Sequence, residues 1–218
     1  MGGLGLMGRR RAISSSPTKT KSSVKIYNRL VVKSGAYFIT DYYPSNYDRI
    51  SWRMATESVG TCFGARKGMG VIVLTQTGNK AYVAWDADTA SQVSMTTNSP
   101  VEREMGMSYD GGYKATYKTI DSASATTIKN YSDTPTEKIS QVPLYICASL
   151  VLNSDFGIDT RYFQGNFYGL KVIDSRTSEL KHDFVPATSS EAVGIYDRVN
   201  RVFYYNSGTG EVTADNEE

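Results

Sequence analysis

Acidic side chains come first in a search for catalytic chemistry, because hydrolysis of a sugar polymer needs two carboxylates flanking the scissile bond. The E-x-D-x-x-E spacing that would project such a pair from one strand does not occur in the sequence. Asp86 and Asp88 come nearest, directly after Trp85, and their place after an apolar run predicts a turn that follows a strand. The carboxylates therefore give no support to a hydrolase.

Metal ligands are equally sparse. An oxygen-rich loop holds Asn153, Asp155 and Asp159, but Ca²⁺ requires about six to eight oxygens, more than this loop or the Asp86–Asp88 pair supplies. Zinc requires closely spaced ligands, and the single histidine, His182, is distant in sequence from both cysteines. We expect neither a metal site nor a cofactor.

A nucleophile with an adjacent base is also missing. His182 follows Lys181 in what the pattern predicts to be a hairpin strand, so we expect an exposed edge histidine rather than a catalytic base. Cys62 and Cys147 lie within apolar runs typical of strands, which predicts two buried free thiols. A disulfide between them would require facing Cα positions, which sequence alone does not reveal. The chain is therefore predicted not to be an enzyme.

Binding chemistry has one candidate loop. Tyr42, Tyr43 and Tyr47 are clustered, and exposed tyrosines of this kind stack on sugar rings. The same residues are equally common in protein–protein contacts, because they combine a large apolar ring with a polar tip. The loop is thus a candidate ligand site for either kind of partner.

Charge is distributed unevenly along the chain. The 218 residues contain 24 basic and 22 acidic side chains, of which residues 1–33 hold 8 basic and no acidic ones, leaving 16 − 22 = −6 for the remainder. Such an asymmetry is typical of a basic arm that binds an acidic partner. We do not expect nucleic acid, because no aromatic residue interleaves these charges before Tyr27 and a stacking platform is lacking.

Residues 1–26 are predicted to form this arm, and residues 27–218 a single domain. Glycines and a Ser/Thr/Lys run give the arm the composition of a linker. An apolar tip followed by three arginines indicates a peptide that inserts into a groove of a partner: Leu4, Leu6, Met7, Arg9, Arg10 and Arg11. The start of the chain does not have the order of a secretory signal, and no apolar run is long enough to span a bilayer.

From residue 24 onwards the pattern predicts an all-β, two-sheet antiparallel sandwich. Tyrosine is abundant, 16 residues in all, and short alternating runs are separated by turn residues such as those at 77–79 and 110–112. In one such run Ile50, Trp52 and Met54 share a face, and we expect Trp52 and Phe184 to be core residues on facing sheets. The predicted strands are 29–33, 37–40, 48–56, 61–65, 70–76, 80–85, 102–108, 112–119, 126–130, 144–152, 162–174, 180–185, 192–196 and 201–205.

Two stretches resemble a known family. Residues 37–44, 48–54 and 62–66 are similar to the opening strands, and residues 167–174, 183–186, 193–197 and 202–210 to the ending, of laminin-G-like, concanavalin-A-like jelly-roll modules in virion proteins of tailed bacteriophages. The resemblance covers residues 30–213. It departs at Thr40-Asp41-Tyr42, where the family usually has a glycine, and at Ala187, where a Cys or Arg often follows the proline.

The resemblance implies a jelly-roll fold and, by association, a role. That role is a non-catalytic structural subunit of the virion (head decoration, head fibre or tail accessory), made in the host cytoplasm and anchored by its arm. Its partners would then be other virion proteins, in a multi-copy or homo-oligomeric assembly. The alternative is a fibre-tip or lectin-like module that binds a receptor or a host surface glycan.

The motif residues also have local roles. Pro186 is expected to end a strand, because proline cannot donate to a β-ladder. Gly208 and Gly210 are expected to supply positive φ in the last turn, and Asn206 to cap that turn with its side chain.

Overall fold

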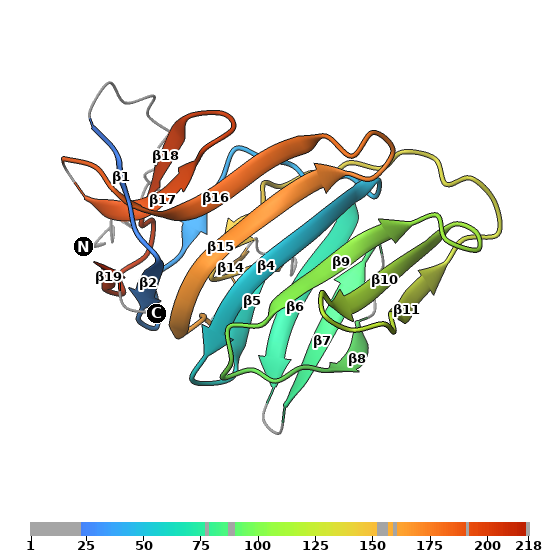
Figure 1. Ribbon diagram of the computed structural model, residues 1–218, viewed down its shortest axis with the longest axis horizontal. Coiled ribbons are helices and arrows are strands. Elements are labelled where there is room, and N and C mark those ends of the chain that lie inside the picture. The colour runs from blue at the N-terminus through green and yellow to red at the C-terminus, as the bar shows by residue number, and fades with distance from the viewer. Residues whose placement is uncertain are drawn as a thin grey trace, which may run out of the picture.

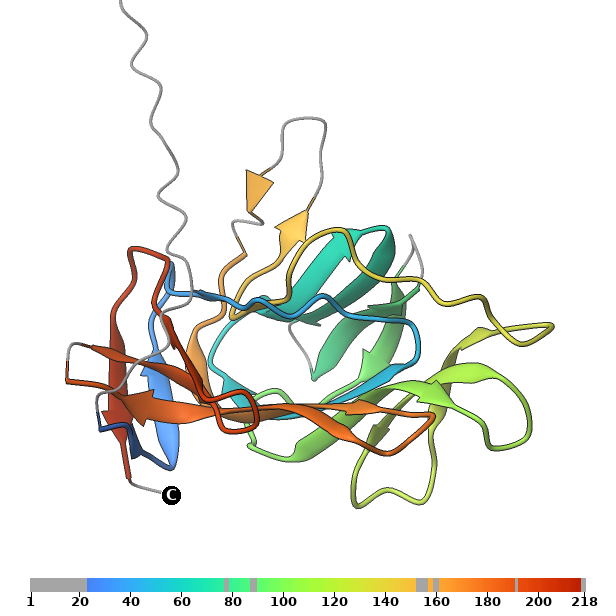
Figure 2. The same ribbon diagram turned by 90° about the horizontal axis from the view of Figure 1, so that it is seen from above.

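The computed structural model describes residues 23–76, 79–86, 90–151, 157–158, 161–190 and 192–216. All regular structure in these residues is β-strand, arranged in two sheets that lie face to face as separate layers (Figures 1 and 2). β17, β18 and β19 lie at one end of the molecule and β10 and β11 at the other. The described residues contain no helix with the length and apolar character that crossing a bilayer requires.

The larger sheet has 11 strands, which pair antiparallel. Its main path runs through β11 (Thr126–Asn130), β10 (Lys114–Thr119), β9 (Glu102–Ser108), β4 (Asp48–Thr56), β15 (Gly165–Asp174), β16 (Leu180–Thr188), β17 (Val193–Asp197) and β18 (Val202–Tyr205). Three strands join from the side: β1 (Lys25–Ile26) on β16, and β2 (Arg29–Val32) between β15 and β19 (Val212–Asp215).

The smaller sheet has 8 strands. Its path runs through β14 (Gly157–Ile158), β13 (Leu150–Val151), β5 (Gly60–Lys67), β6 (Met69–Gln76), β7 (Lys80–Trp85) and β8 (Ser91–Ser94), while β12 (Tyr145–Ile146) pairs with both β5 and β3 (Phe38–Ile39). Its pairing is antiparallel except between β13 and β5, which is parallel. The predicted two-sheet sandwich is therefore confirmed.

The core lies between the sheets and is organised by the alternation along β4. Ile50, Trp52 and Met54 are all buried and belong to one apolar cluster. The Trp52 ring meets Phe63 of β5, across the sandwich, edge to face at a centroid distance of 5.1 Å. β4 is thus fixed by its inward face, as its period of two predicts.

Phe184 is a fully buried core residue, as expected, but its predicted sheet is wrong. It lies on β16, which belongs to the same sheet as the β4 residue Trp52, and its register partner is Leu170 of the intervening β15. Sequence alternation shows which side chains face inward, but it does not show which sheet a strand joins.

Pro186 lies inside β16, which corrects the expectation that it ends the strand. One edge of β16 changes partner at this point, from β15, which pairs as far as Phe184, to β1, which pairs from Ala187. The Pro186 carbonyl accepts a hydrogen bond from the Tyr27 amide (3.0 Å) on this same edge. The missing N–H of proline therefore falls at the gap between two partners, where it leaves the ladder intact.

The glycines of the last turn serve close packing rather than positive φ, which neither of them has. A Cβ on Gly208 would lie 1.9 Å from the Gly35 carbonyl oxygen, and one on Gly210 would lie 2.4 Å from the Ala36 nitrogen. The predicted cap is confirmed, since Asn206 accepts from the Gly208 amide (2.9 Å) and donates to the Gly210 carbonyl (2.7 Å).

Four predicted strands have the observed bounds, namely β4, β7, β9 and β11. The predicted strand 144–152 is instead divided into β12 and β13, because Cys147 between them has a φ of 67°. Cys62 and Cys147 are buried free thiols, as expected, and burial raises the pKa of Cys62 to about 12. Sequence analysis missed β1, β8, β14 and β19, each of two to four residues.

Replacing Trp52 by alanine is expected to lower the free energy of unfolding by about 3–5 kcal/mol, because a fully buried indole is lost from the centre of the core. Chemical denaturation followed by circular dichroism measures the change. The matched control is Tyr82→Ala, on the outer face of β7 and 36% exposed, which should cost far less. Equal and small effects of the two substitutions would show that β4 has another register.

Candidate ligand-binding surfaces

The loop tyrosines that the sequence singled out do not form one surface. Tyr42 and Tyr47 are buried, at 7% and 8% exposure, whereas Tyr43 is 48% exposed. The Tyr42 hydroxyl donates to a carboxylate oxygen of Asp48, and the Tyr47 hydroxyl to the carbonyl of Pro135. The predicted role of Tyr42 and Tyr47 in stacking on a ligand is therefore wrong, because both rings are enclosed and held by their hydroxyls.

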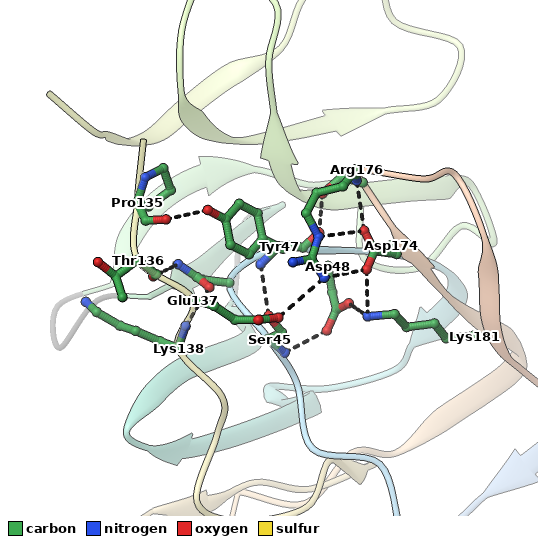
Figure 3. Close-up of polar contacts among 12 residues, drawn as sticks. Ser45, Tyr47, Asp48, Pro135, Thr136, Glu137, Lys138, Asp174, Arg176 and Lys181 are labelled. Carbon is green, nitrogen blue, oxygen red and sulfur yellow. Dashed lines mark hydrogen bonds and ion pairs between the residues drawn. The ribbon is translucent and has the colours of Figure 1, made fainter. Parts of the chain in front are cut away.

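Two neighbouring carboxylates lie at the end of this loop (Figure 3). Asp48 begins β4 and Asp174 ends β15, and the two are register partners, so their like charges lie side by side. Lys181 of β16 bridges them, with its Nζ 2.7 Å from Asp48 and 3.2 Å from Asp174. Asp174 also pairs with Arg176 (2.8 Å), and the hydrogen bond from Arg176 is the main cause that holds the pKa of Asp174 well below its usual range.

The segment between β11 and β12 closes over the same loop (Figure 3). The Asn46 side chain donates to the Thr136 carbonyl (3.0 Å) and accepts from the Lys138 amide (2.9 Å). Arg176 also reaches Glu137 of this segment, at 3.4 Å, and its guanidinium lies 4.5 Å from the centre of the Tyr47 ring. The 42–48 loop thus links β15, β16 and the segment between β11 and β12 through hydrogen bonds and ion pairs.

Asp86 forms the predicted turn after β7, with a φ of 47°, but its side chain is buried. Lys129 and Lys138 lie 2.9 and 3.0 Å from its carboxylate, and the Tyr131 hydroxyl donates to it at 3.1 Å. Burial alone would raise the pKa of Asp86, but the two lysines outweigh that effect and lower it. Asp88 lies outside the described residues, as do the three oxygen-bearing residues at 153, 155 and 159.

His182 is not the exposed edge histidine that the sequence predicted. Its side chain is 15% exposed, and Nδ1 lies 2.7 Å from an oxygen of Asp197, which is fully buried. Its ring stacks on Phe184 at 5.3 Å and meets the ring of Tyr42 at 4.6 Å. His182 is a register partner of the inward-facing Val172, so its side chain also turns toward the core.

Asp197 holds the turn between β17 and β18. Its carboxylate accepts hydrogen bonds from the amides of Asp183 (3.1 Å) and Val199 (3.0 Å), besides its contact with His182. Burial would raise the pKa of Asp197, but His182 and Asn200 lower it below its usual range. The His182–Asp197 pair therefore stabilises this turn. Among the residues that the structure describes, no group of three or more His, Cys, Asp or Glu side chains could hold a metal ion.

A groove of about 260 Å³ lies on the outer face of the larger sheet, and we call it the outer-face groove. Most of its polar lining comes from outward positions of neighbouring strands: Ser51 and Arg53 of β4, Glu102 of β9, Tyr168 and Lys171 of β15, and Asp183 of β16. Arg198, in the turn after β17, completes the lining and pairs with Asp183 at 2.5 Å. These positions face outward because Trp52 and Leu170 between them face the core. The groove therefore combines one aromatic ring with hydrogen-bonding side chains of both charges.

The backbone shapes this groove. The register of β15 on β4 shifts between Phe167 and Gly169, and Gly169 contributes no side chain to the groove. The Arg53 guanidinium lies 4.9 Å from the centre of the Tyr168 ring. The alternating pattern shows which side chains of each strand point outward. It does not show that outward side chains of four different strands meet in one groove, so the groove could not be predicted from the sequence.

A second aromatic surface lies near Tyr43. Tyr37 stacks on Tyr145 (6.1 Å) and on Tyr162 (6.0 Å), from three separate parts of the chain. Burial, together with the neighbouring hydroxyls of Tyr37 and Tyr43, raises the pKa of Tyr145. Of the three predicted loop tyrosines, only Tyr43 therefore remains at a surface where a ligand could reach it.

The predicted arm residues Leu4, Leu6, Met7 and Arg9, like Arg10 and Arg11, lie outside the described residues, which begin at 23. The last two residues of the predicted arm form β1, which pairs with the end of β16.

Comparison with known proteins defines the class of fold. No protein-family model matches the chain, and no curated protein matches it. Among solved structures, the native heptameric SAP-like pentraxin from Limulus polyphemus superposes with a TM-score of 0.51 at 10% identity, over 86% of this chain and 94% of the pentraxin. The chain therefore has a jelly-roll β-sandwich of the lectin-like, concanavalin-A-like type, and at this identity the likeness extends to the fold alone.

Acid is expected to destabilise the domain through Asp174. Its pKa in the folded state lies below the unfolded value of about 3.9, so protonation favours the unfolded chain. The contribution is complete above about pH 5 and is lost as the pH falls through the folded pKa. Asp174→Asn should therefore cost about 1–3 kcal/mol at pH 7 and flatten the dependence of unfolding free energy on pH.

The control for this measurement is Asp110→Asn, at an exposed position in the turn after β9. It should leave the stability at pH 7 nearly unchanged. A wild-type stability that stays constant between pH 6 and pH 3, or an Asp174→Asn variant as stable as the control, would contradict the assigned role of the carboxylate pair.

Proposed function

We propose that the chain is a non-catalytic structural subunit of a tailed-bacteriophage particle, present in many copies as a head decoration, head fibre or tail accessory protein. The observation that carries this proposal is the place of the segments that resemble virion modules. Residues 167–174, 183–186, 193–197 and 202–210 fall on β15, β16, β17 and β18, which are consecutive neighbours in one sheet. The ending of the resemblance thus follows one contiguous set of strands.

The buried carboxylates support a role without catalysis. Each of the five buried aspartates in the described part of the chain faces a basic side chain: Asp48 with Lys181, Asp86 with Lys129 and Lys138, Asp174 with Arg176, Asp183 with Arg198, and Asp197 with His182. A general acid needs the opposite environment, in which burial without a partner raises the pKa toward neutrality. These carboxylates stabilise the turns and strand ends instead.

Charge supports the arm as the anchor. Residues 1–33 carry a net charge of +8 and the remaining residues −6, so the start of the chain and the rest of the domain suit neighbours of opposite charge. A partner groove with an acidic rim would receive both the apolar tip and the arginines. Other virion proteins, including further copies of this chain, are the proposed partners.

Deleting residues 1–24 should leave the domain folded and abolish its incorporation into particles. The deletion removes no described strand, so the melting temperature should change by only a few degrees. Incorporation is measured by mass spectrometry of particles assembled with full-length or truncated chain. Normal incorporation of the truncated protein would place the anchor on the sandwich itself.

Two graded variants separate apolar from electrostatic anchoring. Leu4 and Leu6 to Ser should weaken incorporation more than Arg9, Arg10 and Arg11 to Ala, because burying a leucine contributes about 1.5–3 kcal/mol and an exposed ion pair about 0.2–1 kcal/mol. The reverse order, with strong dependence on salt, would indicate a nucleic-acid partner.

The outer-face groove favours a second candidate function, binding of a surface glycan. Sugar rings have apolar faces that stack on aromatic rings and hydroxyl groups that bind planar charged side chains. Tyr168 supplies the ring, and Arg53, Glu102 and Lys171 supply donors and acceptors around it.

Glycan arrays probed with the whole chain test this candidate. Tyr168→Ala should reduce the signal on any bound glycan at least tenfold, since stacking and one face of the groove are lost. Tyr82→Ala, on the opposite sheet, should leave it unchanged. Binding that survives Tyr168→Ala, or no binding to any glycan, would remove this function from the proposal.

A further inference from the structure

A cavity of about 390 Å³ lies where the edges of the two sheets meet, and we call it the edge cavity. β7 and β8 of the smaller sheet form one wall, and β9 and β10 of the larger sheet form the other. Its size falls within the range of about 300–1,000 Å³ that is typical of small-molecule sites. The polar side chains that line it are Asn79, Lys80, Ser94, Thr96, Arg103 and Thr119.

Arg103 is the unusual member of this lining. Arg103 is 2% exposed. Its side chain points between the sheets, on the same face of β9 as the buried Met105 two residues further on. The two terminal nitrogens of the guanidinium donate to four carbonyls, those of Val101 (2.7 Å), Met54 (3.5 Å), Ser99 (3.4 Å) and Thr96. Among the described residues none of its partners is a carboxylate, in contrast to the five buried aspartates, each of which faces a basic side chain.

A buried cation without a counter-charge is costly, because carbonyl dipoles replace only part of its hydration. Lys80 adds a second positive charge at the same cavity, and it too has no ion pair with a described carboxylate. The lining thus holds two cations and no acidic side chain, although the chain beyond residue 33 carries a net charge of −6. A locally positive cavity in an acidic domain attracts anions.

The other lining groups indicate the rest of the ligand. Ser94, Thr96 and Thr119 offer hydroxyls, and Asn79 offers an amide, each able both to donate and to accept. Such groups suit a molecule rich in hydroxyls. The ammonium of Lys80 suits an oxyanion, which it binds through charge-assisted hydrogen bonds. Arg103, whose terminal N–H groups already donate to carbonyls, adds the attraction of its buried positive charge.

We infer that the edge cavity binds a hydroxyl-rich small molecule that carries an oxyanion, of the class of a carboxylated sugar. This binding goes beyond the proposed structural role and is independent of the outer-face groove, with which the edge cavity shares no lining residue. The oxyanion lies between Lys80 and Arg103, and the hydroxyls of the ligand face the three hydroxyl side chains.

Titration of the ¹⁵N-labelled full chain with glucuronate tests the inference, with glucose as the neutral control of similar shape. Glucuronate should shift amide resonances of the lining residues in a saturable manner, whereas glucose should bind at least tenfold more weakly. Inorganic sulfate should compete for the same resonances. Shifts with sulfate alone, and none that are specific to glucuronate, would reduce the cavity to a general anion site and overturn the sugar-acid assignment.

Two variants locate the site. Lys80→Ala, at an exposed position, should fold normally and weaken glucuronate binding about tenfold, since one charge-assisted contact is lost. Lys114→Ala on β10, which does not line the cavity, should bind as the wild type does. Thr119→Val provides a test that leaves both charges in place, and it should also weaken binding. Unchanged affinity in Lys80→Ala and Thr119→Val, or no saturable shift in the wild type, would overturn the inference.

Discussion

The inward stripe of β4 is the constraint on which the rest of the structure depends. Trp52 has to face the smaller sheet, where it meets Phe63, so that Ser51 and Arg53 on either side of it have to lie on the outer face of the larger sheet. The register of β15 on β4 then brings Tyr168 beside Arg53, and the end of β15 beside the start of β4. One alternation thus sets the core, the outer-face groove and the junction of two carboxylates.

That junction shows how the fold uses charge. Two aspartates that would repel each other are joined by Lys181, and the same solution recurs where each of the other buried carboxylates meets a basic side chain. Removing one partner from such a pair costs more than the pair itself contributes, so the networks fix the turn geometry strongly. Arg103 departs from this rule, because its partners are carbonyl groups, and this difference distinguishes the edge cavity from the structural networks.

Sequence reasoning recovered what local periodicity controls. The bounds of β4, β7, β9 and β11, the inward stripe and the Asn206 cap follow from alternation and turn chemistry. It failed where the answer depends on distant partners. Tyr42 and Tyr47 are buried because the start of β4 and the segment after β11 enclose them, and His182 turns inward because of its pairing with β15.

The central claim is that the buried carboxylates of the described residues pair with basic side chains and thereby stabilise the fold. The most direct measurement is a ¹³C NMR titration of all aspartate and glutamate side chains between pH 2 and pH 8. We expect Asp86, Asp174 and Asp197 to titrate below the ordinary aspartate range, because basic side chains stabilise their charged forms. A buried carboxyl that titrates near neutrality would contradict the account, since such a group is poised to donate a proton in catalysis.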